Sequence, residues 1–278
     1  MSLTGCNKNA MRAGTAIAHI RGEGVSMARW DLMTSDEVGG MIARGRDLAV
    51  LPIGATEQHG PHLSTGCDTI SAELIGERAC DKADILLLPA LAYGCSLGHT
   101  DRWPGTLSLH PQTLSRVTVE LSRWAVANGL TKLLFLSGHG TNDPPLKSAI
   151  LQLRYEFPAA RFATMGLWDI SERSAALYFR DGQDIHANRA ETSLLMNARP
   201  EMVRPDLCHD VPDITPGTHF SYAMPATTPT GVVGAPTEAS ADDGAALIAT
   251  LVEDLAAWLT AALNEPWPAV PPGPCGAA

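Results

Sequence analysis

The 278-residue chain contains no C-x-x-C pair, no cluster of basic residues and no run of eighteen apolar residues. Its six cysteines are scattered, which suits a reducing cytoplasm better than a disulfide framework. A net charge of −10 without a basic cluster argues against nucleic acid as a partner. The lack of a long apolar run argues against a membrane-spanning segment. We therefore expect a cytoplasmic protein that binds neither nucleic acid nor membranes.

Short apolar runs alternate along the chain with segments of helical periodicity. The strand-like runs are Leu48–Ile53, Ile85–Leu88, Lys132–Leu136 and Phe162–Leu167. Apolar residues at three- and four-residue steps predict helices over 69–80, 112–127, 142–155, 187–198 and 240–264. This alternation predicts an α/β fold in which a mainly parallel sheet is covered on both faces.

The domain organisation is expected to be simple, because the chain shows neither a linker nor an internal repeat. We expect one domain over residues 27–265, preceded by a flexible leader over residues 1–26, where periodicity is weak. Residues 266–278 are rich in proline and are expected to form an extended tail. The segment 199–237 is rich in proline, threonine and glycine and is long for a plain loop. It is expected to cover the functional site or a subunit contact.

Carboxylates and imidazoles crowd the stretch after the first strand-like run. Glu57, His59, His62 and Asp68 follow Leu48–Ile53, a continuous apolar run typical of a buried strand. Open α/β sheets place their active sites at the carboxyl ends of the strands. Carboxylate with histidine is also the ligand chemistry of catalytic zinc, manganese or iron. Taken singly, Asp68 could merely cap a helix and Glu57 could be solvated. The whole cluster predicts a metal-dependent enzyme.

A second polar segment follows the strand predicted over 132–136. Glycines flank His139, so the backbone can turn sharply there and approach a ligand closely. A histidine in a turn is often just hydrogen-bonded. Because parallel strands end at the same edge of a sheet, however, His139 should lie near Glu57. We interpret it as a further metal ligand.

A third segment contains Asp184, His186 and Glu191. His186 and Glu191 could reach one point where a loop enters a helix, or Glu191 could simply face solvent in the first helical turn. A fourth segment is a glycine-rich loop that ends at His99, which could contact substrate or be an ordinary loop histidine.

Two cysteines lie near these segments in the sequence. No histidine-linked nucleophile pattern singles out Cys67 or Cys95. We interpret both as small residues that fill space.

Together these segments resemble the creatininase family of metal-dependent amide hydrolases. The matching motifs are Glu57-x-His59-Gly60-x-His62-Leu63 with Asp68, Trp103-Pro104-Gly105-Thr106, Gly138-His139-Gly140-x-Asn142, His186-Ala187-x-x-x-Glu191-Thr192-Ser193 and Gly231-Val232-x-Gly234-x-Pro236. The resemblance runs from about Trp30 to Leu259. It implies a three-layer α/β/α sandwich, a binuclear metal centre and a homo-oligomer, commonly a hexamer.

The resemblance also implies ligand roles for two divalent ions, zinc first, with manganese or iron as alternatives. Glu57 and His139 would bind one ion, His59 the other, and Asp68 would bridge both. In creatininase the second ion also takes a glutamate at the position of Thr141. Threonine cannot replace a carboxylate, which makes Glu191 the candidate for the missing ligand.

Two more departures concern the catalytic surroundings. Ile185 stands where creatininase has a catalytic glutamate, so Asp184 or no residue takes that role. Gly98 stands where relatives often have a glutamate before His99. These changes predict a family member other than creatininase itself.

The predicted function is metal-dependent hydrolysis, by metal-activated water, of a non-peptide C–N bond in a small cyclic amide or formamide. His186 is the first choice for the acid that protonates the leaving nitrogen, and Glu191 the second. His62 and Asn142 are predicted to orient ligands or substrate, and Trp168 to shape the pocket.

One alternative is a peptidase that removes a short C-terminal segment from a precursor peptide. The other is a non-catalytic metal-binding subunit, which the changes at Thr141 and Ile185 favour.

Overall fold

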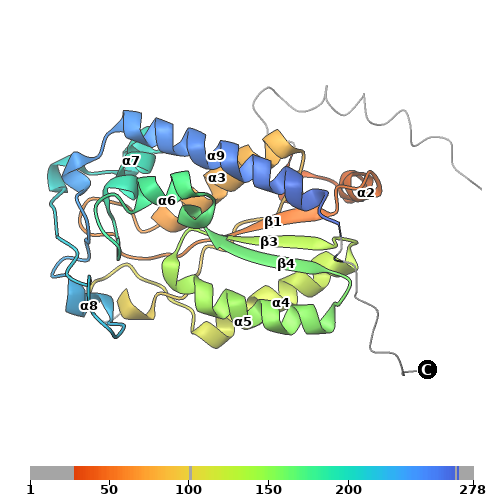
Figure 1. The fold of residues 1–278 in the computed structure, drawn as a ribbon, viewed down its shortest axis with the longest axis horizontal. Coiled ribbons are helices and arrows are strands. Elements are labelled where there is room, and N and C mark those ends of the chain that lie inside the picture. Colours follow the sequence, from red (N-terminus) through yellow and green to blue (C-terminus); the bar gives the residue numbers. More distant parts are fainter. Residues whose placement is uncertain (1–27, 100–101, 267, 269–278) are drawn as a thin grey trace, which may run out of the picture.

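The computed structural model describes residues 28–99, 102–266 and 268. The predicted leader and the predicted tail, apart from Pro266 and Pro268, lie outside these residues. Four strands form one parallel sheet in the order β2-β1-β3-β4 (Figure 1). The strands are β1 (Leu48–Ile53), β2 (Leu86–Leu87), β3 (Lys132–Ser137) and β4 (Arg161–Gly166).

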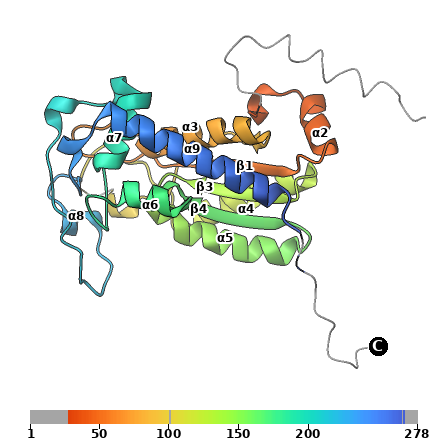
Figure 2. The ribbon, with the colours of Figure 1, turned by 45° about the horizontal axis from the view of Figure 1, so that its top comes forward.

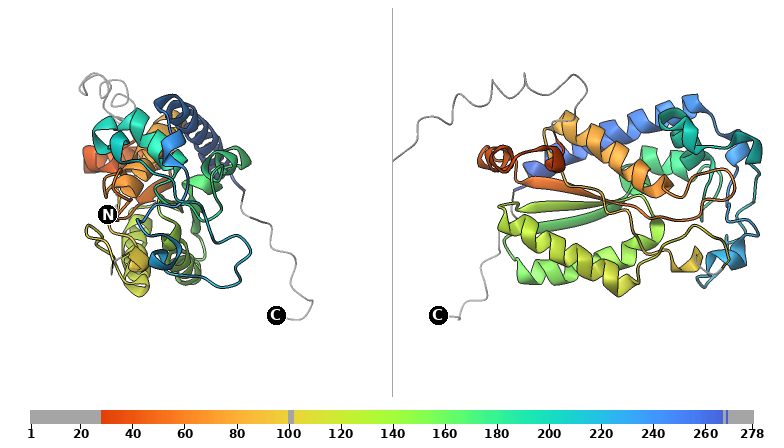
Figure 3. Two further views of the ribbon diagram at one scale, coloured as in Figure 1. Left: turned by 90° about the vertical axis from the view of Figure 1, so that its left-hand side faces the viewer. Right: turned by 180° about the vertical axis from the view of Figure 1, so that it is seen from behind.

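Helices cover both faces of this sheet, which confirms the predicted three-layer α/β/α fold (Figures 1 and 2). One layer contains α3 (Cys67–Ala83), α6 (Glu172–Tyr178), α7 (Arg189–Ala198) and α9 (Ala241–Leu263). The other contains α4 (Pro111–Ala127) and α5 (Asp143–Glu156). The helix α2 (Ser35–Ala43) lies near the amino ends of the strands, and the short α8 (Met224–Thr227) lies at the opposite end of the molecule (Figure 3).

The composition of β1 explains why it is buried on both sides. Leu48 and Val50 pack into the core under α3, α7 and α9. Ala49, Leu51 and Ile53 pack into the second core, against α4 and α5. Since alternate side chains of a strand point to opposite faces, a strand between two helical layers must be apolar at every position.

The helix α9 is long and apolar enough, by length and composition alone, to cross a membrane. It packs against α3 and α7 and buries one face in the core. The buried residues are Gly244, Leu247, Ile248, Leu251, Leu255, Ala256 and Leu259. Their three- and four-residue spacing is that of a helix packed on one side of a globular core.

Three helices, α2, α6 and α8, were not predicted from periodicity because each is shorter than three turns. Both α2 and α6 begin with a capping box, in which Thr34 pairs with Glu37 and Ser171 with Ser174. The Thr34-x-x-Glu37 spacing was therefore a usable sequence signal. Single-turn 3-10 helices fill many of the loops; they are Trp30–Leu32, Leu97–His99, Gly140–Asn142, Leu167–Asp169, Pro200–Met202, Pro205–Leu207 and Pro236–Glu238.

Candidate metal centre

Four of the five ligands expected from the sequence meet at the carboxyl edge of the sheet. Glu57 and His59 follow β1, His139 follows β3, and Asp68 lies in the first turn of α3. Exposure of these four residues is 6% or less. The parallel register aligns Ile53 with Ser137, so the loops after β1 and β3 leave the sheet at the same level.

Gly138 permits the approach of α3 to the end of β3. A Cβ atom at this position would lie 2.1 Å from the backbone oxygen of Asp68. Any side chain there would push the first turn of α3, and with it the Asp68 carboxylate, away from His139. The glycine before His139 is therefore needed for close backbone approach.

The carboxylates and imidazoles lie within coordination range of one another. Glu57 Oε2 lies 3.1 Å from His139 Nε2, and His139 Nδ1 lies 3.3 Å from Asp68 Oδ2. His59 Nε2 lies 2.9 Å from Asp68 Oδ1. In the described ranges, three groups have ligand atoms within 4.8 Å of one another: Glu57, Asp68 and His139; Glu57, His59 and His186; and His59, Cys67 and Asp68.

Several of these atoms have unsatisfied lone pairs. Within the described part of the chain, both Glu57 oxygens, His59 Nε2 and Asp68 Oδ2 are buried without a hydrogen-bond partner. Their short contacts are not aligned as hydrogen bonds. Because buried polar atoms are costly to leave unpaired, convergent lone pairs of this kind fit a divalent cation.

The ring of His186 adds a further lone pair to this site. Its Nε2 lies 2.8 Å from the carbonyl oxygen of Gln58, which can only accept, so Nε2 donates. In the neutral ring, Nδ1 then has the free lone pair, and it lies 3.5 Å from Glu57 Oε1. A cation placed between these two atoms would bind both. From the sequence, His186 was predicted to act as an acid, and its proximity to Glu57 was not predicted.

The electrostatics keep the carboxylates ionised. Burial alone would raise the pKa of Glu57, but His139, His99 and His186 outweigh it and lower the pKa to about 2. Burial opposes ionisation of Asp68 too, yet His59 and His139 hold its pKa below the usual range. The site therefore presents two buried anionic groups, which a divalent cation would neutralise.

Asn142 and His62 connect the segments that surround the site through hydrogen bonds. Asn142 is fully buried, donates to the carbonyl of Gly54 over 3.0 Å and accepts from the backbone N–H of Cys95 over 2.8 Å. His62 Nε2 lies 3.0 Å from the hydroxyl of Thr192. These bonds join the loops after β1 and β2 to the first turns of α5 and α7.

Thr141 occupies the position at which creatininase was expected to supply a glutamate. Its hydroxyl donates to the carbonyl oxygen of Cys95 and lies 2.6 Å from His139 Nε2. It thus contacts a candidate ligand without offering a charge to a second ion.

A cavity of about 480 Å³ opens onto these residues. Its walls include the predicted residues Asp68, His99, His139, Trp168, Asp184, His186 and Glu191, together with Met224 from α8. Met224 belongs to the segment 199–237, so part of that segment reaches the site as expected. Among the described residues, Glu191 and Asp184 lie outside all three ligand groups, and their roles stay predictions.

Burial has a different effect on Glu191. It outweighs the attraction of His59 and raises the pKa of Glu191 to about 7. Asp184 is exposed at the cavity wall. Its pKa is raised mainly because it is partly desolvated there, and to a smaller extent because the Asp213 carboxylate repels its negative charge.

Two residues at the site had no predicted role, although both lie within quoted motifs. Gln58 is buried, and its Nε2 lies 3.0 Å from His99 Nδ1 and 3.2 Å from His186 Nε2. Gly231 has a φ of 81°, and a Cβ there would lie 2.1 Å from Gln58 Oε1. Gly231, in the last of the quoted motifs, therefore leaves space for the side chain of Gln58, in the first motif.

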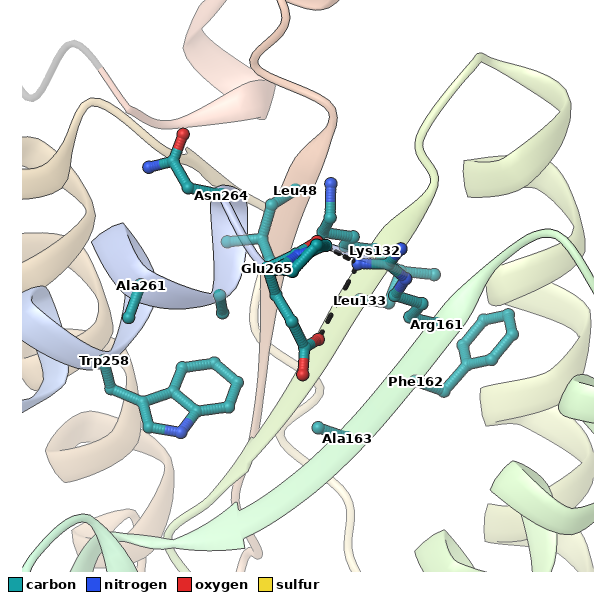
Figure 4. A pocket seen from close by; sticks show the side chains of 12 residues that line it. Leu48, Lys132, Leu133, Arg161, Phe162, Ala163, Trp258, Ala261, Asn264 and Glu265 are labelled. Atoms are coloured by element: carbon teal, nitrogen blue, oxygen red, sulfur yellow. Dashed lines mark hydrogen bonds and ion pairs between the residues drawn. The ribbon is translucent and has the colours of Figure 1, made fainter. Parts of the chain in front are cut away.

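A second cavity, of about 560 Å³, lies at the amino ends of the strands (Figure 4). Leu48, Leu133, Phe162 and Trp258 line it, and Arg161 donates to the backbone carbonyl of Glu265 at its rim. None of the metal-ligand groups found among the described residues lies there.

Buried carboxylates and imidazoles at the carboxyl edge of a parallel sheet are the donor set of a metal-dependent α/β enzyme. The chain belongs to the creatininase family, because the family model described as creatinine amidohydrolase matches residues 31–259. The family assignment from the sequence motifs is thereby confirmed.

Three similar proteins illustrate the range of the family. The mycofactocin precursor peptide peptidase of Mycobacterium ulcerans is 33% identical over 74% of this chain and 81% of its own. The creatinine amidohydrolase of Pseudomonas putida is 28% identical over 81% of this chain and 93% of its own. A crystal structure of creatininase matches with a TM-score of 0.78 and 25% identity, covering 86% of this chain and 99% of that one.

Proposed function

We propose that the protein hydrolyses an amide bond with divalent metal ions held at the Glu57–Asp68 site. Glu57, Asp68 and His139 would hold one ion, while His59 and Asp68 would contribute to a second. The observation that supports this most is the convergence of buried, unpaired donor atoms. A bound ion would lower the pKa of coordinated water to about 7 and polarise the amide carbonyl.

The metal is proposed to be zinc, with manganese or iron as alternatives, since carboxylate and imidazole donors accept all three. Creatininase has been solved in a manganese form, which supports a divalent ion in this family. The protein's own contribution is to keep Glu57 and Asp68 ionised and to hold the ligands in position through Gly138 and Asn142.

The leaving nitrogen must receive a proton from the cavity wall. The bond from His186 Nε2 to the carbonyl of Gln58 already uses the proton of a neutral ring. Glu191 lines the same cavity, and burial raises its pKa to about 7, so it is partly protonated at neutral pH. These features favour Glu191 over His186 as the acid, which reverses the order of preference from the sequence.

The substrate is proposed to be a small cyclic amide or formamide. A cavity of about 480 Å³ has the size of a site for a small molecule, and Trp168 and Phe179 give it apolar walls. Thr141 argues against creatinine, because the carboxylate expected in creatininase is missing.

Peptide hydrolysis is the second candidate. It is supported by the 33% identity to a peptidase that acts on a precursor peptide, over 74% of this chain. On this alternative, the cavity lined by Met224 and Trp168 would admit a peptide terminus.

The two candidates are separated by incubating the metal-loaded protein with lactams, formamides and short peptides. Ring opening of a lactam, or release of formate from a formamide, would support the first candidate, and release of a dipeptide the second. Glu57→Ala is the control and should abolish either activity. Inertness toward the whole panel, with the metal bound, would instead favour a non-catalytic metal-binding subunit.

We also propose that the protein is a cytoplasmic homo-oligomer, with the hexamer expected from the family resemblance. Trp124 on α4 is 73% exposed and Tyr155 on α5 is 88% exposed, as suits residues at a subunit contact. Light scattering would give the mass of the particle, and a monomer would refute this part of the proposal.

A further inference from the structure

Cys67 immediately precedes Asp68 and is 1% exposed. Its thiol sulfur, a nitrogen of His59 and an oxygen of Asp68 lie within 4.8 Å of one another. A buried thiol can be a simple space-filler, which is how the sequence was interpreted. The neighbouring atoms indicate whether the Cys67 thiol also binds a ligand.

The hydrogen bonding of His59 leaves one of its ring nitrogens with a free lone pair. His59 Nδ1 lies 3.2 Å from the carbonyl oxygen of Glu57, which can only accept, so Nδ1 donates. In the neutral ring, Nε2 then has the free lone pair. Nε2 is buried without a hydrogen-bond partner among the described residues, although Asp68 Oδ1 lies 2.9 Å away. His59 thus contributes an unpaired nitrogen to a group that also contains a carboxylate and a thiol.

We infer that Cys67 is a metal ligand, which completes with His59 and Asp68 the second metal position of this centre. The inference rests on the metal centre proposed above. It also accounts for Thr141, because a thiolate would supply the negative charge that a threonine cannot. On binding the ion, the Cys67 S–H bond breaks, sulfur keeps the electron pair and the proton passes to solvent.

The inference has a consequence for metal choice. Thiolate sulfur is a soft ligand, which suits zinc or iron, whereas manganese prefers oxygen ligands. The position formed by His59, Cys67 and Asp68 should therefore select zinc over manganese. Replacing Cys67 by serine should reduce that preference by about tenfold or more.

The direct test is to remove metal from the purified protein, reload it with Co²⁺ and record the absorption spectrum. Coordination by Cys67 predicts a thiolate-to-cobalt charge-transfer band in the near ultraviolet. Cys67→Ser should eliminate the band, and Cys67→Val gives a second variant if serine perturbs folding. Cys80→Ala is the matched control and should retain the band, because Cys80 is buried in the same helix and belongs to none of the ligand groups found in the described part of the chain.

The outcomes separate this inference from the proposed function. Bound Co²⁺ without a charge-transfer band, or a band that persists in Cys67→Ser, would overturn the role of Cys67 alone. Failure of the wild-type protein to bind Co²⁺ at all would overturn the metal centre and the inference together.

Discussion

The two ends of the sheet contain cavities of similar size and opposite chemistry. The cavity at the carboxyl ends, about 480 Å³, is lined by carboxylates and imidazoles, among them Asp68, whose Oδ2 is buried without a hydrogen-bond partner among the described residues. The cavity at the amino ends, about 560 Å³, is lined mainly by apolar side chains and by the stem of Arg161, which bonds to Glu265. The larger and more apolar cavity is thus not the one that contains the reactive groups. Unpaired buried atoms locate the site better than volume does.

This difference has an energetic reason. Buried polar atoms without partners reduce stability, so a fold retains them only where they serve a ligand or a reaction. Among the described residues, none of these atoms lies at the amino ends of the strands, and this end is expected to contribute stability alone. Substitutions at the two ends should therefore have separable effects on turnover and on unfolding.

Replacing Glu57 by glutamine should have the largest effect. The amide retains the shape of the side chain but removes a charge next to His139 and His186. We expect metal binding to be lost and kcat/KM to fall by about 10³-fold or more. Metal analysis and steady-state rates check this, with circular dichroism as the control for folding. If the variant binds metal and hydrolyses substrate at the wild-type rate, the carboxyl end of the sheet cannot be distinguished from the amino end as the functional one.

Asn142→Ala tests the support behind the site. The substitution removes bonds to the backbone of Gly54 and Cys95, which hold two loops of the site together. Loss of such a supporting residue typically costs about 10–100-fold in metal affinity or activity, and we expect a value in that range. Metal titration measures it. An unchanged metal affinity would show that the loops hold their positions without Asn142.

Trp258→Ala tests the opposite end. Trp258 is half-buried against the apolar core and lines the second cavity. Its removal should lower the free energy of unfolding by about 2 kcal/mol, less than for a fully buried tryptophan. Turnover per folded molecule should stay at the wild-type level. Urea denaturation and rate measurements decide, and a selective loss of kcat would mean that this cavity takes part in function.

The smallest effect is expected at the α4–α5 surface, away from both cavities. Hydrogen bonds from Arg123 and Gln152 lower the pKa of Glu156 to about 2. Because this pKa is depressed in the folded state, the stabilisation is fully present above pH 4.5 or so and is lost as the pH falls toward 2. Arg123→Ala should lower the melting temperature slightly at pH 7, because the pair is exposed, and the difference from the wild type should shrink as the pH falls toward 2. Thermal unfolding across this pH range is the measurement, and an unaltered profile would refute the assignment.

Much of this fold could be predicted from local patterns. β1 has the predicted bounds because its continuous apolar run matches a strand buried on both faces. β2 is shorter than predicted, since only Leu86 and Leu87 pair with β1. The helices α2 and α6 are too short for periodicity to reveal them.

The site was less accessible to prediction, because its contacts depend on distant segments. Proximity of Glu57 to His139 follows from parallel strands that end together. The position of His186 depends on its backbone pairing with Val233, in a segment without clear periodicity. Cys67 differs from other buried thiols only through the neighbours that folding brings to it.

Calorimetric titration of the metal-free protein with Zn²⁺ tests the central claim most directly, since it needs no knowledge of the substrate. The account predicts tight binding by the wild-type protein and its loss in Asp68→Asn, because Asp68 contributes to both proposed positions. Wild-type protein that does not bind Zn²⁺, or an Asp68→Asn variant that binds it undiminished, would contradict the account.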